Sequence, residues 1–134
     1  MRNYLQLIGI ALQNQLPPDF QSAFLFAEVD DGFTSLGVYF SSSPHRVVFR
    51  YAKRPLDDLV YRFWKNGQDR ILPRSWATIE YMIVGTKLDV AFTYSGDFDI
   101  HEAPWVRDER VLARRFPGYV IDRSSPDARS EPVA

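Results

Sequence analysis

The residues best able to do chemistry stand in one short acidic segment, Asp97-Phe98-Asp99-Ile100-His101-Glu102. In an extended strand alternate side chains share a face, so Asp97, Asp99 and His101 would project together. Such a group can bind a divalent cation. The same residue types more often form a polar loop in which one carboxylate caps the following helix. We expect the loop, and a small metal-dependent enzyme using residues 97–102 stays open as an alternative.

The rest of the chain offers little material for nucleophilic catalysis. It contains no cysteine, and a serine nucleophile would need one of only two histidines, His45 and His101. The stretch from Ser41 to His45 is typical of a connection between strands. No pair of glycines frames a lysine as in phosphate-binding loops. We therefore predict that the protein is not an enzyme and binds no cofactor or metal.

Large aromatic side chains are the other candidates, in this case for binding a partner. Aromatic residues make up 15% of the chain, which includes Trp64, Trp76 and Trp105. Burial in a core is the simplest explanation for each tryptophan. Tryptophan is also enriched at the energetic centres of interfaces, so Trp64 or Trp76 is an alternative candidate for an interface anchor.

The charge and composition exclude several classes of partner. The net charge is −1, which favours neither a nucleic-acid binder nor a membrane-surface protein. The charges are nevertheless banded, because residues 46–76 carry eight cations and three anions whereas residues 77–102 carry one cation and five anions. The chain has no cysteine and no apolar run of about 20 residues that could span a membrane. We expect a cytoplasmic protein.

Helical spacing of apolar residues predicts three helices that would help to position these side chains. The first spans residues 4–16, the second follows Pro55 and is expected to stop at Asn66-Gly67, and the third begins near Pro104. The second helix is the most regular, with an apolar stripe made of Leu56, Leu59, Val60, Phe63 and Trp64.

Alternating apolar and polar residues predict strands between the helices. Three strands are expected within residues 23–51, with Asp31-Gly32 as the hairpin turn between the first two. Two more are expected at residues 75–84 and 88–94, joined by a turn at Gly85-Thr86.

This order of elements predicts the fold class. A helix, three strands, a helix, two strands and a helix (α-β-β-β-α-β-β-α) suit a single α+β domain over residues 1–121, with an antiparallel sheet of about five strands packed with helices. Residues 122–134 contain few apolar side chains and are expected to form a disordered tail.

Five short stretches carry core and turn residues in a characteristic order: Phe26-Ala27-Glu28-Val29, Gly37-Val38-Tyr39-Phe40, Trp76-Ala77-Thr78-Ile79-Glu80-Tyr81, Lys87-Leu88-Asp89-Val90-Ala91-Phe92-Thr93-Tyr94 and Phe116-Pro117-Gly118-Tyr119. With the first helix and the arginine-rich last helix, their order and spacing resemble the YezG-like family of bacterial immunity proteins. The resemblance covers residues 4–119.

The resemblance implies a specific partner. Such proteins are encoded beside polymorphic toxins, including those of contact-dependent growth inhibition, and the toxin domains are often nucleases. A member would bind, one to one, the C-terminal toxin domain of a large secreted or surface protein. It would block the toxin's active site or substrate path without contacting nucleic acid or membrane itself.

A nuclease cleft is basic, so an acidic face on the inhibitor would be complementary to it. The candidate toxin-binding residues are the acidic Asp30, Asp31, Asp97, Asp99 and Glu102, together with Trp64 and Trp76. Each acidic residue has an alternative explanation as an ordinary solubilising turn residue. For the whole chain, an adaptor that binds a protein other than a toxin remains a further alternative.

Overall fold

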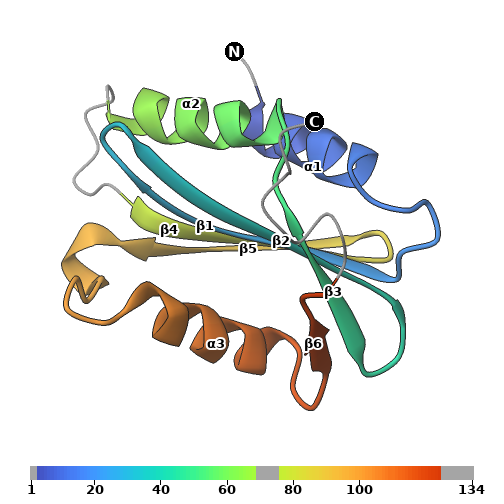
Figure 1. Cartoon of the computed structure of the whole chain (residues 1–134). Coiled ribbons are helices and arrows are strands. Elements are labelled where there is room, and N and C mark those ends of the chain that lie inside the picture. Colours follow the sequence, from blue (N-terminus) through green and yellow to red (C-terminus); the bar gives the residue numbers. More distant parts are fainter. Residues whose placement is uncertain (1–2, 69–75, 125–134) are drawn as a thin grey trace, which may run out of the picture.

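The computed structural model describes residues 3–68 and 76–124, in which one six-stranded sheet carries helices on both faces (Figure 1). The elements in chain order are α1 (Tyr4–Asn14), β1 (Ser22–Asp30), β2 (Phe33–Ser43), β3 (Arg46–Tyr51), α2 (Leu56–Gln68), β4 (Trp76–Val84), β5 (Lys87–Tyr94), the 3₁₀ turn η1 (Ser95–Asp97), α3 (Pro104–Arg115) and β6 (Val120–Asp122). The predicted α+β class and the predicted order of helices and strands are confirmed.

The strand order across the sheet is β5-β4-β1-β2-β3-β6. All neighbouring strands are antiparallel except β3 and β6, which are parallel. Strand β6 is a sixth strand that was not predicted, because three residues are too short to show a period. Strand β1 is central and is buried from Ser22 to Val29, which explains why apolar residues occupy both of its faces.

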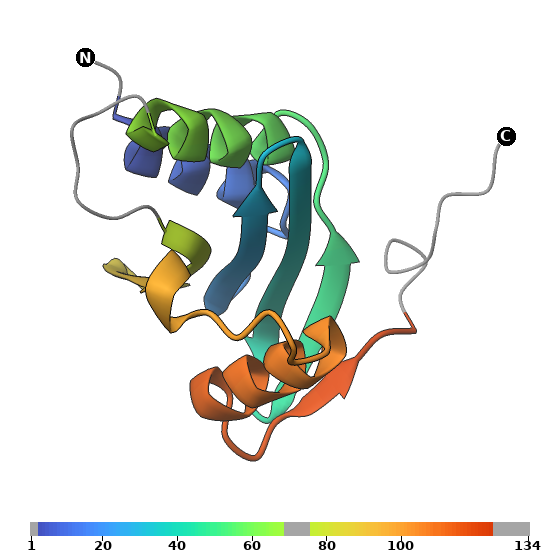
Figure 2. The ribbon, with the colours of Figure 1, turned by 90° about the vertical axis from the view of Figure 1, so that its left-hand side faces the viewer.

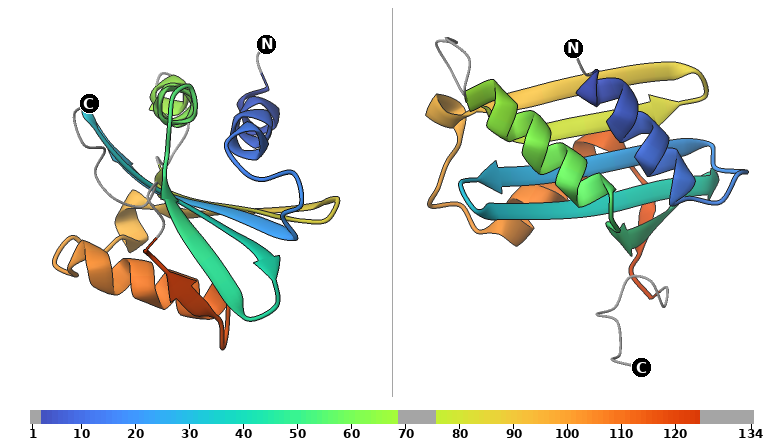
Figure 3. Two further views of the ribbon diagram at one scale, coloured as in Figure 1. Left: turned by 45° about the vertical axis from the view of Figure 1, so that its right-hand side comes forward. Right: turned by 90° about the horizontal axis from the view of Figure 1, so that it is seen from above.

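Helices α1 and α2 lie side by side on one face of the sheet (Figure 3). The predicted stripe of α2 is confirmed, since Leu56, Val60 and Trp64 are buried in the same apolar cluster as Leu12 of α1 and Leu25 of β1. The expected stop of α2 at Asn66-Gly67 is wrong, because the helix continues to Gln68. A glycine inside a helix costs about 1 kcal/mol relative to alanine and does not by itself end the helix.

Helix α1 approaches the sheet closely at Gly9. A Cβ atom on this residue would lie 2.5 Å from the hydroxyl oxygen of Tyr81 in β4. The same hydroxyl donates a hydrogen bond of 2.6 Å to the carbonyl oxygen of Leu5, one turn earlier in the helix. The missing side chain therefore makes room for a tyrosine that joins α1 to the sheet.

Helix α3 covers the opposite face alone among the described helices. Its apolar residues Val111 and Leu112, followed by Phe116, pack against Phe24 and Phe26 of β1. The Phe116 and Phe24 rings meet edge to face with centroids 5.9 Å apart. This second cluster is smaller than the one beneath α1 and α2.

The predicted end of the domain at residue 121 falls within the last strand. Strand β6 includes Asp122, which forms an ion pair with Arg46 of β3. The Arg123 guanidinium lies over the Phe49 ring, 5.3 Å from its centroid. The remainder of the predicted tail, residues 125–134, lies outside the described residues. None of the helices within the described ranges has the length and apolar character needed to cross a bilayer.

Candidate functional site

The predicted acidic residues gather at one end of the sheet. In the antiparallel register Glu28 of β1 pairs with Thr78 of β4, and Trp76 of β4 pairs with Tyr94 of β5. The end of β1 and the end of β5 therefore lie at the same edge of the fold, which faces the viewer in Figure 2. This arrangement places at one end all five acidic residues singled out from the sequence: Asp30, Asp31, Asp97, Asp99 and Glu102.

The β1–β2 hairpin tip is held against α2. Gly32 adopts a left-handed φ of 73°, which its lack of a side chain permits, and its N–H donates to the Tyr61 hydroxyl over 3.2 Å. That hydroxyl lies 3.5 Å from the Asp31 carboxylate, and the Lys65 ammonium lies 3.7 Å from the same carboxylate. Exposed pairs of this kind contribute at most about 1 kcal/mol, and the Asp31 side chain remains 80% exposed.

The acidic segment before α3 forms a loop, as expected, with one difference in detail. The Asp99 carboxylate accepts a hydrogen bond of 2.9 Å from the His101 N–H and so closes a turn within the loop. The expected acidic cap on α3 is absent, because the N-cap residue is Ala103 and it has no side-chain bond. Glu102 forms an ion pair with Arg110, nearly two turns into the helix.

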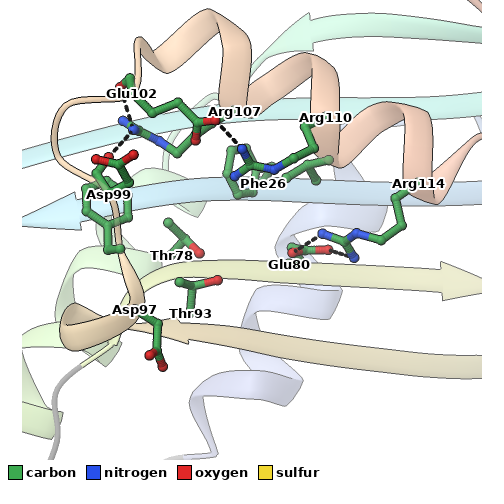
Figure 4. Close-up of a pocket in the computed structure, with 12 residues that line it drawn as sticks. Phe26, Thr78, Glu80, Thr93, Asp97, Asp99, Glu102, Arg107, Arg110 and Arg114 are labelled. Carbon is green, nitrogen blue, oxygen red and sulfur yellow. Dashed lines mark hydrogen bonds and ion pairs between the residues drawn. The ribbon is translucent and has the colours of Figure 1, made fainter.

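The geometry does not assemble the alternative metal site. Within residues 3–68 and 76–124, no group of three or more histidine or acidic side chains is placed to hold a metal ion. Figure 4 shows the Asp97 carboxylate directed away from Asp99 and Glu102. The extended conformation that would have aligned Asp97, Asp99 and His101 is replaced by η1 and the turn at Asp99.

A small polar pocket of ≈ 150 Å³ lies between α3 and the ends of β4 and β5 (Figure 4). Its walls include two threonine hydroxyls, from Thr78 and Thr93, and the carboxylate of Glu80. Glu80 accepts two hydrogen bonds from Arg114, of 3.0 and 2.9 Å, and one of 2.8 Å from Arg115. These bonds join two arginines of α3 to a glutamate of β4, and so they hold the helix on the sheet.

The charge state of Glu80 follows from these contacts. Burial acts to raise the pKa of the carboxyl, but the hydrogen bonds and positive charges of Arg114 and Arg115 outweigh it and lower the pKa below its ordinary value. Arg115 also pairs with Asp89 of β5. Glu80 is therefore ionised at neutral pH.

Arg107 fixes the loop that precedes α3. Its guanidinium forms two hydrogen bonds with Glu28 of β1, of 2.8 and 3.0 Å, and both side chains are almost completely buried. The remaining N–H groups donate to the carbonyl oxygens of Asp99, over 2.9 Å, and Glu102, over 2.6 Å. The guanidinium carbon also lies 4.3 Å from the centroid of the Phe98 ring. One side chain thus attaches the loop to the central strand.

Large apolar side chains stand exposed at this end of the sheet, on the loop, at the start of α3 and on the β1–β2 hairpin. Ile100 is 75% exposed, Trp105 at the start of α3 is 65% exposed, and Phe33 opposite Asp30 is 56% exposed. We call the combined region the end surface, defined by Asp30, Asp31, Phe33, Asp97, Asp99, Ile100, Glu102 and Trp105. Exposed apolar residues next to charged ones are typical of protein-binding surfaces.

The structure corrects the expectation for the tryptophans. Trp64 and Trp76 are 7% and 8% exposed, and the Trp64 indole N–H donates to the Trp76 carbonyl oxygen over 2.8 Å. The Trp76 ring also packs on Phe63 and Phe92. Both are core residues, so neither is available as an interface anchor on this surface. Trp105, for which burial was the simpler explanation, is the exposed one.

The end surface includes residues that the sequence did not single out. Trp105 stands at the first turn of α3 beside Pro104, where a helical period is not yet established, so its orientation could not be read from spacing. Arg107 belongs to the arginine-rich last helix, and arginine side chains are mostly exposed, whereas this one is buried. The available signal was Glu28, a carboxylate in an otherwise apolar strand that requires a buried cation as partner.

Comparison of the chain with models of known protein families and with curated protein sequences found no match.

Proposed function

We propose that this protein is a cytoplasmic immunity protein that binds a cognate toxin domain one to one and blocks its active site or substrate path. Two observations support the proposal: the resemblance of residues 4–119 to the YezG-like immunity family, and the composition of the end surface. The end surface carries it, because it combines exposed anchors with a concentration of carboxylates on a backbone fixed by Arg107.

The apolar part of the end surface supplies the affinity in this proposal. Trp105 and Ile100 are exposed in the free protein and would be buried by a partner. A few buried aromatic or aliphatic anchors usually account for most of the binding free energy of an interface. Because Arg107 already orders the loop, binding costs less conformational entropy than it would for a mobile loop.

The acidic part supplies the selectivity and the association rate. Asp30, Asp31 and Asp99 are exposed, and a toxin with a basic cleft is electrostatically complementary to them. Nucleases have such clefts because they bind phosphates. The proposed toxin class is therefore a nuclease, and the proposed mechanism is occlusion of the cleft by the end surface.

The experiment that tests the function uses the neighbouring gene. The C-terminal domain of the secreted or surface protein encoded beside this chain is expressed in a susceptible cell, with and without the chain, and growth is measured. We expect growth arrest that the chain relieves, and a stable 1:1 complex of the two purified proteins. Continued arrest in the presence of the folded chain, with no complex formed, would contradict an immunity role.

The acidic part of the end surface can be tested separately. Asp31→Lys combined with Asp97→Lys should slow association with that toxin domain about tenfold at low salt while leaving the domain folded. A matched control, Asp19→Lys with Asp58→Lys, makes the same change in net charge at exposed positions away from the end surface. Stopped-flow measurements at two salt concentrations give the association rates of both double variants. Equal rates would show that the acidic part of the end surface does not contribute to toxin association.

A further inference from the structure

Strand β5 leaves one long edge of the sheet open. In the described part of the chain it pairs with β4 on one side and has no strand on the other (Figure 3). Eight residues long, it contrasts with the opposite edge, where β6 has only three residues. An unpaired edge presents a row of backbone N–H and C=O groups that can pair with another strand.

The usual protections of an edge strand are missing from β5. The strand contains no proline, and Lys87 stands at its first position. Its one interior charge, Asp89, is paired with Arg115 of the same chain, so it does not guard the edge. Leu88 is 50% exposed, whereas Phe92 and Tyr94 pack on the core from the same face of the strand. The edge is therefore apolar on one face, and the one irregularity in its pairing with β4 lies at its end, where Trp76 and Thr78 face Tyr94 and Thr93.

We propose that a second copy of this chain pairs with β5, antiparallel and across a two-fold axis, to form one continuous sheet. The axis runs perpendicular to the sheet. The face covered by α1 and α2 therefore lies on the same side of the continuous sheet in both copies. Side chains directly opposite one another must then come from the same face. This interaction is independent of the proposed function.

Face matching places the two-fold axis at a residue, and axes at Val90 and Ala91 each pair seven residues without opposing like charges. We take the axis at Ala91, because it pairs all four residues of the apolar face with one another. In this register Ala91 lies opposite itself, Val90 lies opposite Phe92, and Leu88 lies opposite Tyr94. These are β-branched, aliphatic and aromatic pairs, which stabilise antiparallel sheets. Moving the axis to Asp89 would set two carboxylates opposite each other and would shorten the paired segment. The chosen register pairs residues 88–94 of each copy and opposes no like charges.

The self-complementarity of this strand favours a second copy over a foreign strand as the occupant. Each apolar residue on the face of Leu88 meets another apolar residue, and Asp89 meets the hydroxyl of Thr93. Seven paired residues form a smaller contact than the 1,200–2,000 Å² that is typical of stable interfaces. The dimer is therefore expected to be weak and concentration-dependent.

Sedimentation velocity of the full chain over a concentration series tests the proposal. We expect the sedimentation coefficient to rise from that of a monomer to that of a dimer. Ala91→Lys sets two ammonium groups opposite each other on the axis and should weaken dimerisation about tenfold. Within its own chain the new lysine lies opposite Glu80, so the fold is retained. Ser42→Lys, an equal charge change at an exposed residue of β2, should leave dimerisation unchanged.

A single cysteine tests the register. Oxidation of Ala91→Cys should give a disulfide-linked dimer, because only this register sets residue 91 opposite itself and the chain has no other cysteine. Hydrogen exchange of the wild-type chain tests the dimer without any variant. The exchange of the β5 amides should slow as the protein concentration rises. A monomer up to millimolar concentration, or a dimer that Ala91→Lys does not weaken, would overturn the proposal.

Discussion

The two faces of the sheet are covered in different ways. Beneath α1 and α2 the contacts are apolar, with Leu12, Leu25 and Val60 fully buried. Beneath α3 the apolar cluster is smaller, and two carboxylates of the sheet, Glu28 and Glu80, are paired with arginines of the helix. The first face is stabilised mainly by apolar burial, with hydrogen bonds from Tyr81 and Trp64 joining α1 and α2 to the sheet, whereas the second is positioned by buried ion pairs.

This difference has a consequence for the end surface. Apolar packing tolerates small shifts of a helix, but a guanidinium bonded to Glu28 and to two loop carbonyls allows one placement. The loop that carries Ile100 and leads to Trp105 belongs to the ion-paired face. The part of the end surface that carries Ile100 and Trp105 is therefore fixed by electrostatic contacts, and the bulk of the apolar burial lies on the other face.

Removal of the buried cation should have the largest effect. Arg107→Met leaves Glu28 buried without a partner and should lower the free energy of unfolding by about 3–5 kcal/mol. Glu28→Leu combined with Arg107→Met removes both charges and should recover most of that loss. Urea denaturation of the two variants checks this, and a loss below about 1 kcal/mol for the single variant would show that the pair is not essential.

A cavity on the apolar face should have a slightly smaller effect. Leu12→Ala removes a completely buried side chain and should cost about 3 kcal/mol. Ile10→Ala, two residues earlier on the same helix, removes a half-exposed side chain and should cost less than about 0.5 kcal/mol. If the two variants have equal midpoints in urea, α1 does not cover the sheet as described.

The smallest effect is expected in the pH dependence of stability, which tests the ion-paired face beneath α3. The pKa of Glu80 is lowered in the folded chain, so its contribution is fully present above the ordinary carboxyl pKa and is lost as pH falls below it. Glu80→Gln should therefore flatten the loss of stability between about pH 5 and pH 3.

Asp108 provides an internal control with the opposite sign. Burial, and then the charge of Glu28, raise the pKa of Asp108. The folded chain therefore takes up this proton before the unfolded chain does, which stabilises it as pH falls. Asp108→Asn should steepen the acid loss that Glu80→Gln flattens. Thermal unfolding midpoints from pH 3 to pH 7 measure how each variant changes the slope of stability against pH relative to the wild-type chain. Changes of the same sign in the two variants would contradict the assigned contacts.

The sequence predicted the elements better than their tertiary contacts. Helix α2 follows from a regular apolar stripe, and the β1–β2 turn follows from Asp31-Gly32, because both signals are local. Strand β6 pairs with β3 across a long sequence separation and has too few residues to show a pattern. No local rule could have predicted it.

The candidate site was predicted in part. The five acidic residues could be picked out as turn residues, and antiparallel register brings the two turns to one end of the sheet. The burial of Arg107 and the exposure of Trp105 depend on how α3 is rotated on the sheet. That rotation is set by Glu28 and Glu80, whose partners lie 79 and 34–35 residues away.

The most direct test of the account is the affinity of the Trp105→Ala variant for the toxin domain encoded beside this chain. Val120→Ala is the matched control, since Val120 is about as exposed as Trp105 but lies on β6, beyond the other end of α3. We predict that Trp105→Ala weakens binding by at least about 2 kcal/mol, close to thirtyfold, while Val120→Ala changes it by less than about twofold. Equal dissociation constants for the two variants by calorimetry would contradict the assignment of the end surface as the toxin-binding site.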